Sequence, residues 1–252
     1  MRQALQHVGL AGCSRAQAEP GRHIGYLEAH IEQGETLESD GLKIGIVTSI
    51  VGIWQYRITF NGEQNHAGTT RMAIRKDAGL ALVRLCVAID DQFPKLCGPR
   101  TVWTTGSITL DPGAPSIIPG RAEMLFQIRD DDPRVIEWLE DLLRSMATRV
   151  SAESRCTVEV ERIRTGSPAI MDETFQGAIE TASLRFAEGR SIRIPSGAGH
   201  DAQVLARIMP AGMMFVPSIG GVSHHWTEDT AEADIVTGAE VFVEACQRLL
   251  AQ

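Results

Sequence analysis

The densest group of chemically useful side chains lies in the run Tyr-Leu-Glu-Ala-His-Ile-Glu-Gln-Gly at residues 26–34. An apolar, strand-like lead-in ends here in a glycine, so an imidazole, carboxylates and an amide gather where a strand meets a turn. In open α/β sheets, ligands bind outside such strand ends. Alternation along a strand predicts that Glu28, His30 and Glu32 share one face. A single histidine beside acidic residues is more often hydrogen-bonded than metal-bound, so this run alone favours the hydrogen-bonded interpretation.

Three further clusters combine histidines with glycines in loops beside predicted strands. They are residues 65–70 (Asn-His-Ala-Gly-Thr-Thr), 196–201 (Ser-Gly-Ala-Gly-His-Asp) and 216–225 (Val-Pro-Ser-Ile-Gly-Gly-Val-Ser-His-His). The second precedes a predicted helix and could bind an anion or a carbonyl group, although Asp201 could equally be a simple helix cap. Neutral imidazoles with carboxylates suit a zinc- or manganese-type hydrolytic centre. Taken together, the clusters indicate a metallohydrolase.

The composition limits the partners and the compartment. The 252 residues carry a net charge of −8, which argues against nucleic acids and anionic membranes, since both select basic surfaces. No apolar run approaches the roughly 18 residues of a membrane span, and the N-terminus lacks the apolar core of a signal peptide. The five cysteines are scattered and odd in number. They predict reduced thiols in a cytoplasmic protein.

The hydrophobic pattern of residues 52–164 predicts a self-contained unit. Strands are expected at 52–61, 101–110, 121–129 and 156–163, and helices at 74–93 and from Pro133. The first helix has an apolar stripe of Ala78, Leu82, Leu85 and Ile89, and the second one of Val135, Leu139, Leu142 and Met146. The order β-α-β-β-α-β is that of a ferredoxin-like fold, in which two helices cover one face of a four-stranded antiparallel sheet.

The flanking segments, 1–51 and 165–252, are predicted to form one α/β domain that the ferredoxin-like unit interrupts. Strands expected at 42–51, 191–195 and 213–216 alternate with helices at 172–187, 202–208 and 232–250. For the last helix, the predicted core stripe is Ile235, Ala239, Phe242, Cys246 and Leu249.

The four motifs occur in one order that resembles the N-carbamoyl-L-amino-acid hydrolase, β-ureidopropionase and allantoate amidohydrolase group. This group belongs to the dinuclear-zinc aminoacylase/carboxypeptidase superfamily, and the resemblance covers essentially the whole chain. It implies a metal-binding α/β domain, 1–51 and 165–252, interrupted by a lid and dimerisation domain at 52–164. A homodimer formed through the lid domain is therefore expected.

The resemblance also implies roles for residues near the predicted strand ends. His30 resembles a ligand of one metal ion and His224 a ligand of the other, so two divalent ions, zinc or manganese, are expected. Gln33, Gly199 and His200 resemble substrate contacts.

Three residues of the predicted lid domain complete the expected site. His66 resembles the imidazole that crosses the dimer interface to polarise the scissile carbonyl, an oxyanion-type role. Arg129 resembles the arginine that holds the substrate carboxylate, a task that suits a planar guanidinium fork. Ser116 stands where the family usually has an asparagine, and its hydroxyl reaches less far. The expected substrate is a small ureido or carbamoyl carboxylate.

One departure from the family concerns the metal centre. The family's catalytic domain begins well before Met1, in a section that carries a metal-ligand histidine, a bridging aspartate, a ligand glutamate and the catalytic-base glutamate. No matching motif precedes His30 here. We therefore expect a truncated metal-dependent amidohydrolase that cleaves a linear C–N bond of an N-carbamoyl amino acid or an allantoate-like ureido acid. Two alternatives stay open, a non-catalytic dimeric carboxylate-binding protein and a related aminoacylase or peptidase.

Overall fold

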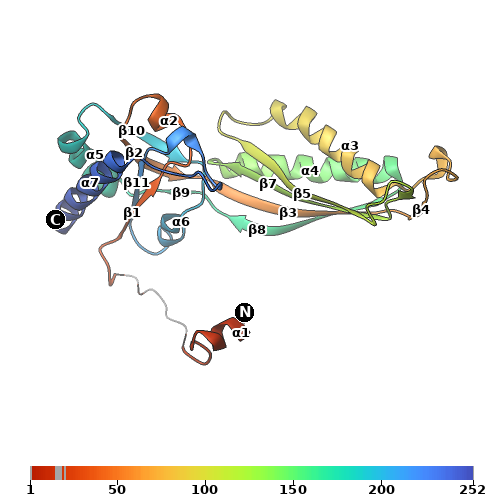
Figure 1. Ribbon diagram of the computed structural model, residues 1–252, viewed down its shortest axis with the longest axis horizontal. Helices are drawn as coiled ribbons and strands as arrows, with labels where there is room; N and C mark the ends of the chain where they lie inside the picture. Colours follow the sequence, from red (N-terminus) through yellow and green to blue (C-terminus); the bar gives the residue numbers. More distant parts are fainter. Residues whose placement is uncertain (1, 15–18, 20, 252) are drawn as a thin grey trace.

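The chain forms two separate sheets (Figure 1). The computed structural model describes residues 2–14, 19 and 21–251. One sheet is mixed and has the strand order β1-β11-β2-β10, with β9 paired to β2; the other is antiparallel and has the order β5-β7-β3-β8. The α/β class predicted from the sequence is therefore confirmed. We refer to the two sheets as the mixed sheet and the antiparallel sheet.

The mixed sheet is covered by helices on both faces. Its strands are β1 (Tyr26–Ile31), β2 (Ile44–Ile50), β9 (Ala169–Ile170), β10 (Ser191–Ser196) and β11 (Ala211–Val216). β1 runs parallel to β11, and β10 parallel to β2, whereas β11 and β2 are antiparallel. Two long helices pack on one face, α5 (Glu173–Phe186) and α7 (Glu232–Leu250). Two short helices pack on the other, α2 (Thr36–Ser39) and α6 (Asp201–Leu205).

The helix α7 has the predicted bounds but only part of the predicted core stripe, since Phe242 and Leu249 pack at the margin of the core. Ile235 and Ala239 are exposed, and the buried side lies one position away, at Asp234, Gly238, Val241 and Ala245. The reason is close packing at Gly238, where an added Cβ would lie 2.4 Å from Cγ1 of Val216. The helix turns its small residues to the sheet because they let the two backbones approach each other.

The antiparallel sheet has the predicted order β-α-β-β-α-β. Its elements are β3 (Gly52–Asn61), α3 (Ala78–Gln92), β5 (Val102–Asp111), β7 (Arg121–Asp130), α4 (Pro133–Ser154) and β8 (Thr157–Gly166). Both helices lie on one face, where the predicted stripe of α3 is fully buried (Figure 1). In α4 the centre of the core is formed by Ile136 and Leu143, while the predicted Val135 and Leu142 lie at its margin. The amphipathic stripe is wider than one row of side chains, so its centre was misplaced by one position.

Short elements complete the structure. They are α1 (Arg2–His7), β4 (Asn65–His66), β6 (Ile117–Ile118) and three 3-10 turns at Met72–Ile74, Phe93–Lys95 and Ile219–Gly221. β4 pairs with β6 at the end of the antiparallel sheet that lies away from the mixed sheet (Figure 1). Among the described helices, none has both the length and the hydropathy that a bilayer crossing requires.

The chain crosses between the two sheets twice. It passes from β2 to β3 through Val51, and from β8 to β9 through residues 167–168. These crossings lie beside the predicted domain boundaries at 51/52 and 164/165. That each part is a domain of its own stays a prediction.

The core of the antiparallel sheet makes a first test possible. Leu85 is completely buried on α3, so Leu85→Ala should lower the free energy of unfolding by about 2–5 kcal/mol, through lost transfer energy and a cavity. The identical substitution at Leu184, which is 62% exposed, should cost less than about 1 kcal/mol. Urea unfolding followed by circular dichroism measures both, and equal losses would contradict the described core.

Candidate functional site

A cavity of about 440 Å³ lies where strand ends of the mixed sheet meet the antiparallel sheet. Residues after β1, β10 and β11 form one side of it, and Arg129 on β7 forms the other. The lining residues are Glu32, Gln33, Gly34, Thr36, Arg129, Ile194, Pro195, Gly197, Ala198, Phe215, Ser223 and His224. The cavity brings together three of the predicted residues, Gln33, Arg129 and His224.

Gln33 is held in place by two serines from the loop after β11. Its backbone N–H donates to Oγ of Ser218 at 2.9 Å, and its side-chain Nε2 donates to Oγ of Ser223 at 2.9 Å. Gln33 has a φ of +58°, a left-handed conformation that non-glycine residues adopt only when their surroundings enforce it. The two serines fix the Gln33 amide and leave its carbonyl oxygen to accept from a ligand.

The prediction that Glu32 shares a face with Glu28 and His30 is wrong. β1 ends at Ile31, and the Glu32 carboxylate turns forward to accept from the N–H groups of Thr36 at 3.0 Å and Leu37 at 2.8 Å. A carboxylate there satisfies free N–H groups at the start of α2. Glu32 therefore stabilises the loop that carries Gln33.

The N-terminus of α6 is already occupied by a carboxylate of the protein. Oε2 of Glu28 accepts from the Ala202 N–H at 2.8 Å. The loop 196–201 was predicted to bind an anion or a carbonyl group at this helix start, and Glu28 occupies one of the N–H groups that such a ligand would use. Asp201 is not the cap, since the N-cap residue is His200.

His30 and His200 contact each other. Their ring centroids lie 4.7 Å apart in an edge-to-face arrangement. Nδ1 of His30 lies 2.8 Å from the carbonyl oxygen of Ile31, which can only accept, so in the neutral ring Nδ1 carries the proton and Nε2 has the lone pair. His200 is buried, with Nε2 2.8 Å from Oγ of Ser196, and burial followed by the charge of His30 lowers the pKa of His200 to about 4. His200 is thus neutral near pH 7.

The loop that carries His224 packs tightly on the loop that carries Gln33. Gly221 has a φ of +64°, and a Cβ added there would lie 2.9 Å from the backbone nitrogen of Glu35. His224 itself adopts a φ of +56°, and its N–H donates to Oε2 of Glu228 at 2.9 Å. Hydrogen bonds from Ser223 and from this N–H lower the pKa of the exposed Glu228 carboxyl. The glycine is needed for the close approach that places His224 at the cavity.

The described residues do not form a complete metal centre. His30 offers a lone pair at Nε2, which suits a metal ligand. Yet no group of three or more His, Cys, Asp and Glu side chains in the described parts of the chain is arranged to hold an ion. Two imidazoles also fall short of the three or four protein ligands of zinc sites. The predicted two-metal centre therefore does not fit the donors of this chain alone.

Arg129 joins the two sheets at the cavity. Its Nη1 donates to the carbonyl oxygen of Gly197 at 2.8 Å, across from β7 to the loop after β10. Burial lowers the pKa of Arg129, and the positive charge of Arg164 adds to that shift. An anionic ligand would offset both effects. Gly199 lies on the same loop, where an added Cβ would be 3.2 Å from Cδ1 of Ile53.

His66 and Ser116 lie together at the opposite end of the antiparallel sheet. The N–H of Ala67 donates to the Ser116 carbonyl oxygen at 3.0 Å. Nδ1 of His66 accepts from the N–H groups of Gly68 at 2.9 Å and Thr69 at 3.2 Å, so the ring proton is on Nε2, which is free to donate. Within one copy of the chain, these two residues do not reach the cavity (Figure 1).

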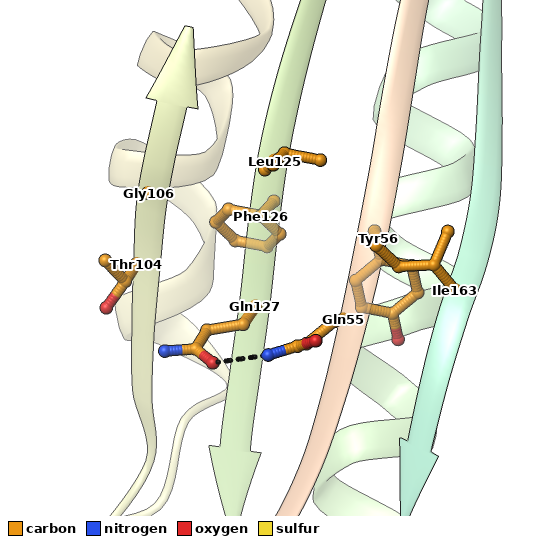
Figure 2. Close-up of a pocket in the computed structure, with 8 residues that line it drawn as sticks. All are labelled: Gln55, Tyr56, Thr104, Gly106, Leu125, Phe126, Gln127 and Ile163. Carbon is orange, nitrogen blue, oxygen red and sulfur yellow. Dashed lines mark hydrogen bonds between the residues drawn. The ribbon is translucent and has the colours of Figure 1, made fainter. Parts of the chain in front are cut away.

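The open face of the antiparallel sheet carries a second hollow, of about 230 Å³ (Figure 2). Gln55 donates to Gln127 at 3.4 Å across its floor. Its lining consists of Gln55, Tyr56, Thr104, Gly106, Leu125, Phe126, Gln127 and Ile163. These eight residues include no imidazole, thiol or carboxylate. The cavity beside Arg129 is therefore the better candidate for chemistry.

Sequence reasoning missed residues whose role is to position other groups through hydrogen bonds. Ser218 and Ser223 lie inside the 216–225 motif, but their partner is Gln33, more than 180 positions away. Glu28 was noted as a carboxylate, not as the cap of α6. Only a motif with known spatial partners could have identified such contacts.

Residues 8–248 match the model of peptidase family M20/M25/M40. The chain belongs to this family. Within the family it falls in the hydantoinase/carbamoylase amidohydrolase group, as its motifs predicted. Members of the group are metal-dependent amidohydrolases that act on C–N bonds.

Two relatives and one solved structure illustrate the likeness. The N-carbamoyl-L-amino acid amidohydrolase of Geobacillus stearothermophilus is 33% identical over 98% of this chain and 60% of its own length. The allantoate amidohydrolase of Bacillus subtilis (strain 168) is 35% identical over 89% of this chain and 54% of its own. The crystal structure of a hydantoinase/carbamoylase family amidase from Burkholderia phymatum matches 98% of this chain and 60% of that one, with 42% identity and a TM-score of 0.83. The M20 chain thus spans about 60% of the length of such relatives.

The donor count leads to a prediction for metal content. After dialysis against zinc or manganese and removal of free ion, the 252-residue M20 chain should retain far less than one ion per chain, because two imidazoles bind weakly. Elemental analysis measures this, with His30→Ala as the variant that should abolish what remains. Two tightly bound ions per chain would contradict the incomplete centre.

Proposed function

We propose that this chain is the carboxylate-binding part of an amidohydrolase acting on an N-carbamoyl amino acid or an allantoate-like ureido acid. The observation that carries the proposal is the position of Arg129, partly buried at a cavity that also presents Gln33 and His224. A guanidinium fork matches a carboxylate in two parallel hydrogen bonds. The cavity is of a size that suits a small ligand.

Each group at the cavity has a task in this proposal. Arg129 exchanges the Gly197 carbonyl for the substrate carboxylate, and the Gln33 carbonyl oxygen accepts from a ureido N–H. Gly199 and His200, on the loop after Gly197, are the further substrate contacts in this proposal. His30 and His224 act as ligands of two zinc or manganese ions, whose remaining ligands have to come from polypeptide outside these 252 residues.

A second copy of the chain supplies His66 in this proposal. The donor at Nε2 of His66 suits a developing oxyanion, but His66 lies at the far end of the antiparallel sheet. Two features of that sheet support a homodimer, the free edge of β5 and an exposed apolar side of α3 with Leu80, Val83 and Val87. Ser116 would approach the partner's substrate together with His66.

The proposal places the protein in the reducing cytoplasm. The scattered Cys13, Cys86, Cys97, Cys156 and Cys246 support this placement, because none of them is joined in a disulfide among the described residues.

One alternative is favoured by a specific observation, the shortage of metal ligands. A non-catalytic protein of this family would bind a carboxylate at Arg129 and form a dimer without turnover. An aminoacylase or peptidase is the other alternative. The names of the similar proteins favour hydrolysis of a ureido substrate over both of these alternatives.

Hydrolysis assays separate these functions. The purified chain, supplied with Zn²⁺ or Mn²⁺, is offered N-carbamoyl-L-amino acids, allantoate, N-acetyl amino acids and dipeptides, and amine or ammonia release is measured. Because these residues lack a complete metal centre, the proposal expects the chain alone to bind the ureido acid with little turnover. It expects any form of the protein that binds two metal ions to cleave ureido substrates fastest. Faster cleavage of N-acyl or peptide substrates contradicts it, and saturable binding of the ureido acid without turnover in a form that binds two metal ions establishes the non-catalytic alternative.

Arg129→Gln should weaken binding of an N-carbamoyl-L-amino acid about 10- to 100-fold, because charged hydrogen bonds to the carboxylate are lost. Binding is measured by calorimetry. Arg164→Gln is the matched control, since Arg164 is an exposed arginine near Arg129 that does not line the cavity. Equal weakening by the two substitutions would argue against a specific carboxylate contact at Arg129.

A composite site predicts complementation between two impaired variants of any form of the protein that shows turnover. At substrate concentrations well below saturation, His66→Ala and Arg129→Gln should each show little activity. Mixing them should restore about a quarter of the activity, since half of the dimers are mixed and each has one intact site. Sedimentation of the mixture confirms that dimers exchange. No recovery in freely exchanging dimers would show that His66 acts within its own chain or not at all.

A further inference from the structure

Gln203 contacts both crossings between the two sheets with one side-chain amide. It lies on α6 and is only 6% exposed. Its Nε2 donates to the carbonyl oxygen of Val51 at 2.8 Å and to that of Ser167 at 2.8 Å. Val51 immediately precedes β3, and Ser167 immediately follows β8. The two places where the chain passes between the sheets are therefore held by the same amide group.

The chemistry of the side chain suits this task. A glutamine NH₂ group has two hydrogens, and each can serve one carbonyl. A buried carbonyl that loses its donor is costly, because no water replaces the bond. The two bonds therefore resist any motion that separates the crossings or moves α6 away from them.

The segment that leads into α6 is also part of the candidate site. The N–H of Val51 donates to the carbonyl oxygen of Ser196 at 3.1 Å. The next residue, Gly197, accepts from Arg129. Residues 196–203 thus contact the crossings at both of their ends and contact Arg129 between them.

We propose that Gln203 is a positioning residue that sets the orientation of the antiparallel sheet relative to the mixed sheet, and so holds Arg129 over the cavity. The walls of the cavity come from different sheets, with Gln33 on one side and Arg129 on the other. A small rotation about the crossings moves the guanidinium away from a ligand bound at Gln33, and such misplacement is costly for binding and catalysis. The role assigned to Arg129 rests on the proposed function, whereas the role of Gln203 in orienting the two sheets does not.

A matched pair of substitutions tests the proposal in the full chain. Gln203→Met keeps the length and volume of the side chain and removes both donors. Gln176 is the control, because it is similarly buried, with 4% exposed, and its Nε2 also donates to a backbone carbonyl, that of Met171 at 2.8 Å, but within the mixed-sheet part. Both variants remove a buried hydrogen-bonding amide, and only the first lies at the crossings.

Hydrogen exchange followed by mass spectrometry gives the first readout. In Gln203→Met, amides in peptides spanning residues 49–54 and 165–170 should exchange about tenfold faster than in the unmodified chain, while helix α5 is unchanged. In Gln176→Met the crossing peptides should keep their rates. Equal rates at the crossings in both variants, or acceleration spread evenly over the chain, would overturn the proposal.

Ligand affinity gives the second readout. For an N-carbamoyl-L-amino acid, Gln203→Met should weaken binding about tenfold, while binding of an alkylurea without the carboxylate is unchanged, and Gln176→Met should alter neither. Equal weakening for both ligands would overturn the link to Arg129. If the unmodified chain does not bind the acid at all, the proposed function fails together with that link, and the exchange rates still decide whether Gln203 fixes the orientation.

Discussion

The hydrogen bond from Arg129 to the Gly197 carbonyl crosses between two sheets that pack around separate cores. Everything proposed for the site depends on that junction, because one wall of the cavity comes from each sheet. The mixed sheet contributes fixed loops, in which Gln33 is held by two serines and its neighbouring loop by the carboxylate of Glu32. The antiparallel sheet contributes a cation at the end of β7. Chemistry at this place therefore requires the orientation of the sheets to be maintained.

Most of the fold could be predicted from the sequence because local patterns determine it. The alternation at 52–61 and the stripe of α3 gave the antiparallel unit its elements and their order. The errors arose where tertiary packing decides which face of a helix is buried. α7 turns Gly238 toward the sheet for close contact with Val216, which a hydrophobic stripe cannot reveal. In α4 the predicted Leu139 and Met146 are buried, and Val135 and Leu142 lie at the margin because the buried stripe is wider than one row of side chains.

The sequence predicted which motifs belong to the candidate site, but not which of their residues lie together in space. Gln33, Arg129 and His224 meet at one cavity, whereas His66 and Ser116 lie at the other end of the antiparallel sheet. Side chains that only hold other groups were not recognisable, because a serine or glutamine carries no sign of a partner far away in the sequence. The same is true of Glu28, which accepts from one N–H at the start of α6. Membership of the M20 family explains why the motifs occur together, and the structure adds which of them share a cavity.

The most direct test of the account is a crystal structure of the 252-residue chain with an N-carbamoyl-L-amino acid bound. The account predicts the ligand carboxylate within hydrogen-bonding distance of the Arg129 guanidinium, with the ureido group beside Gln33 and the Gly197 contact released or shared. A ligand bound elsewhere, with Arg129 still donating to Gly197 alone, would contradict the central claim that the junction between the sheets is the substrate site.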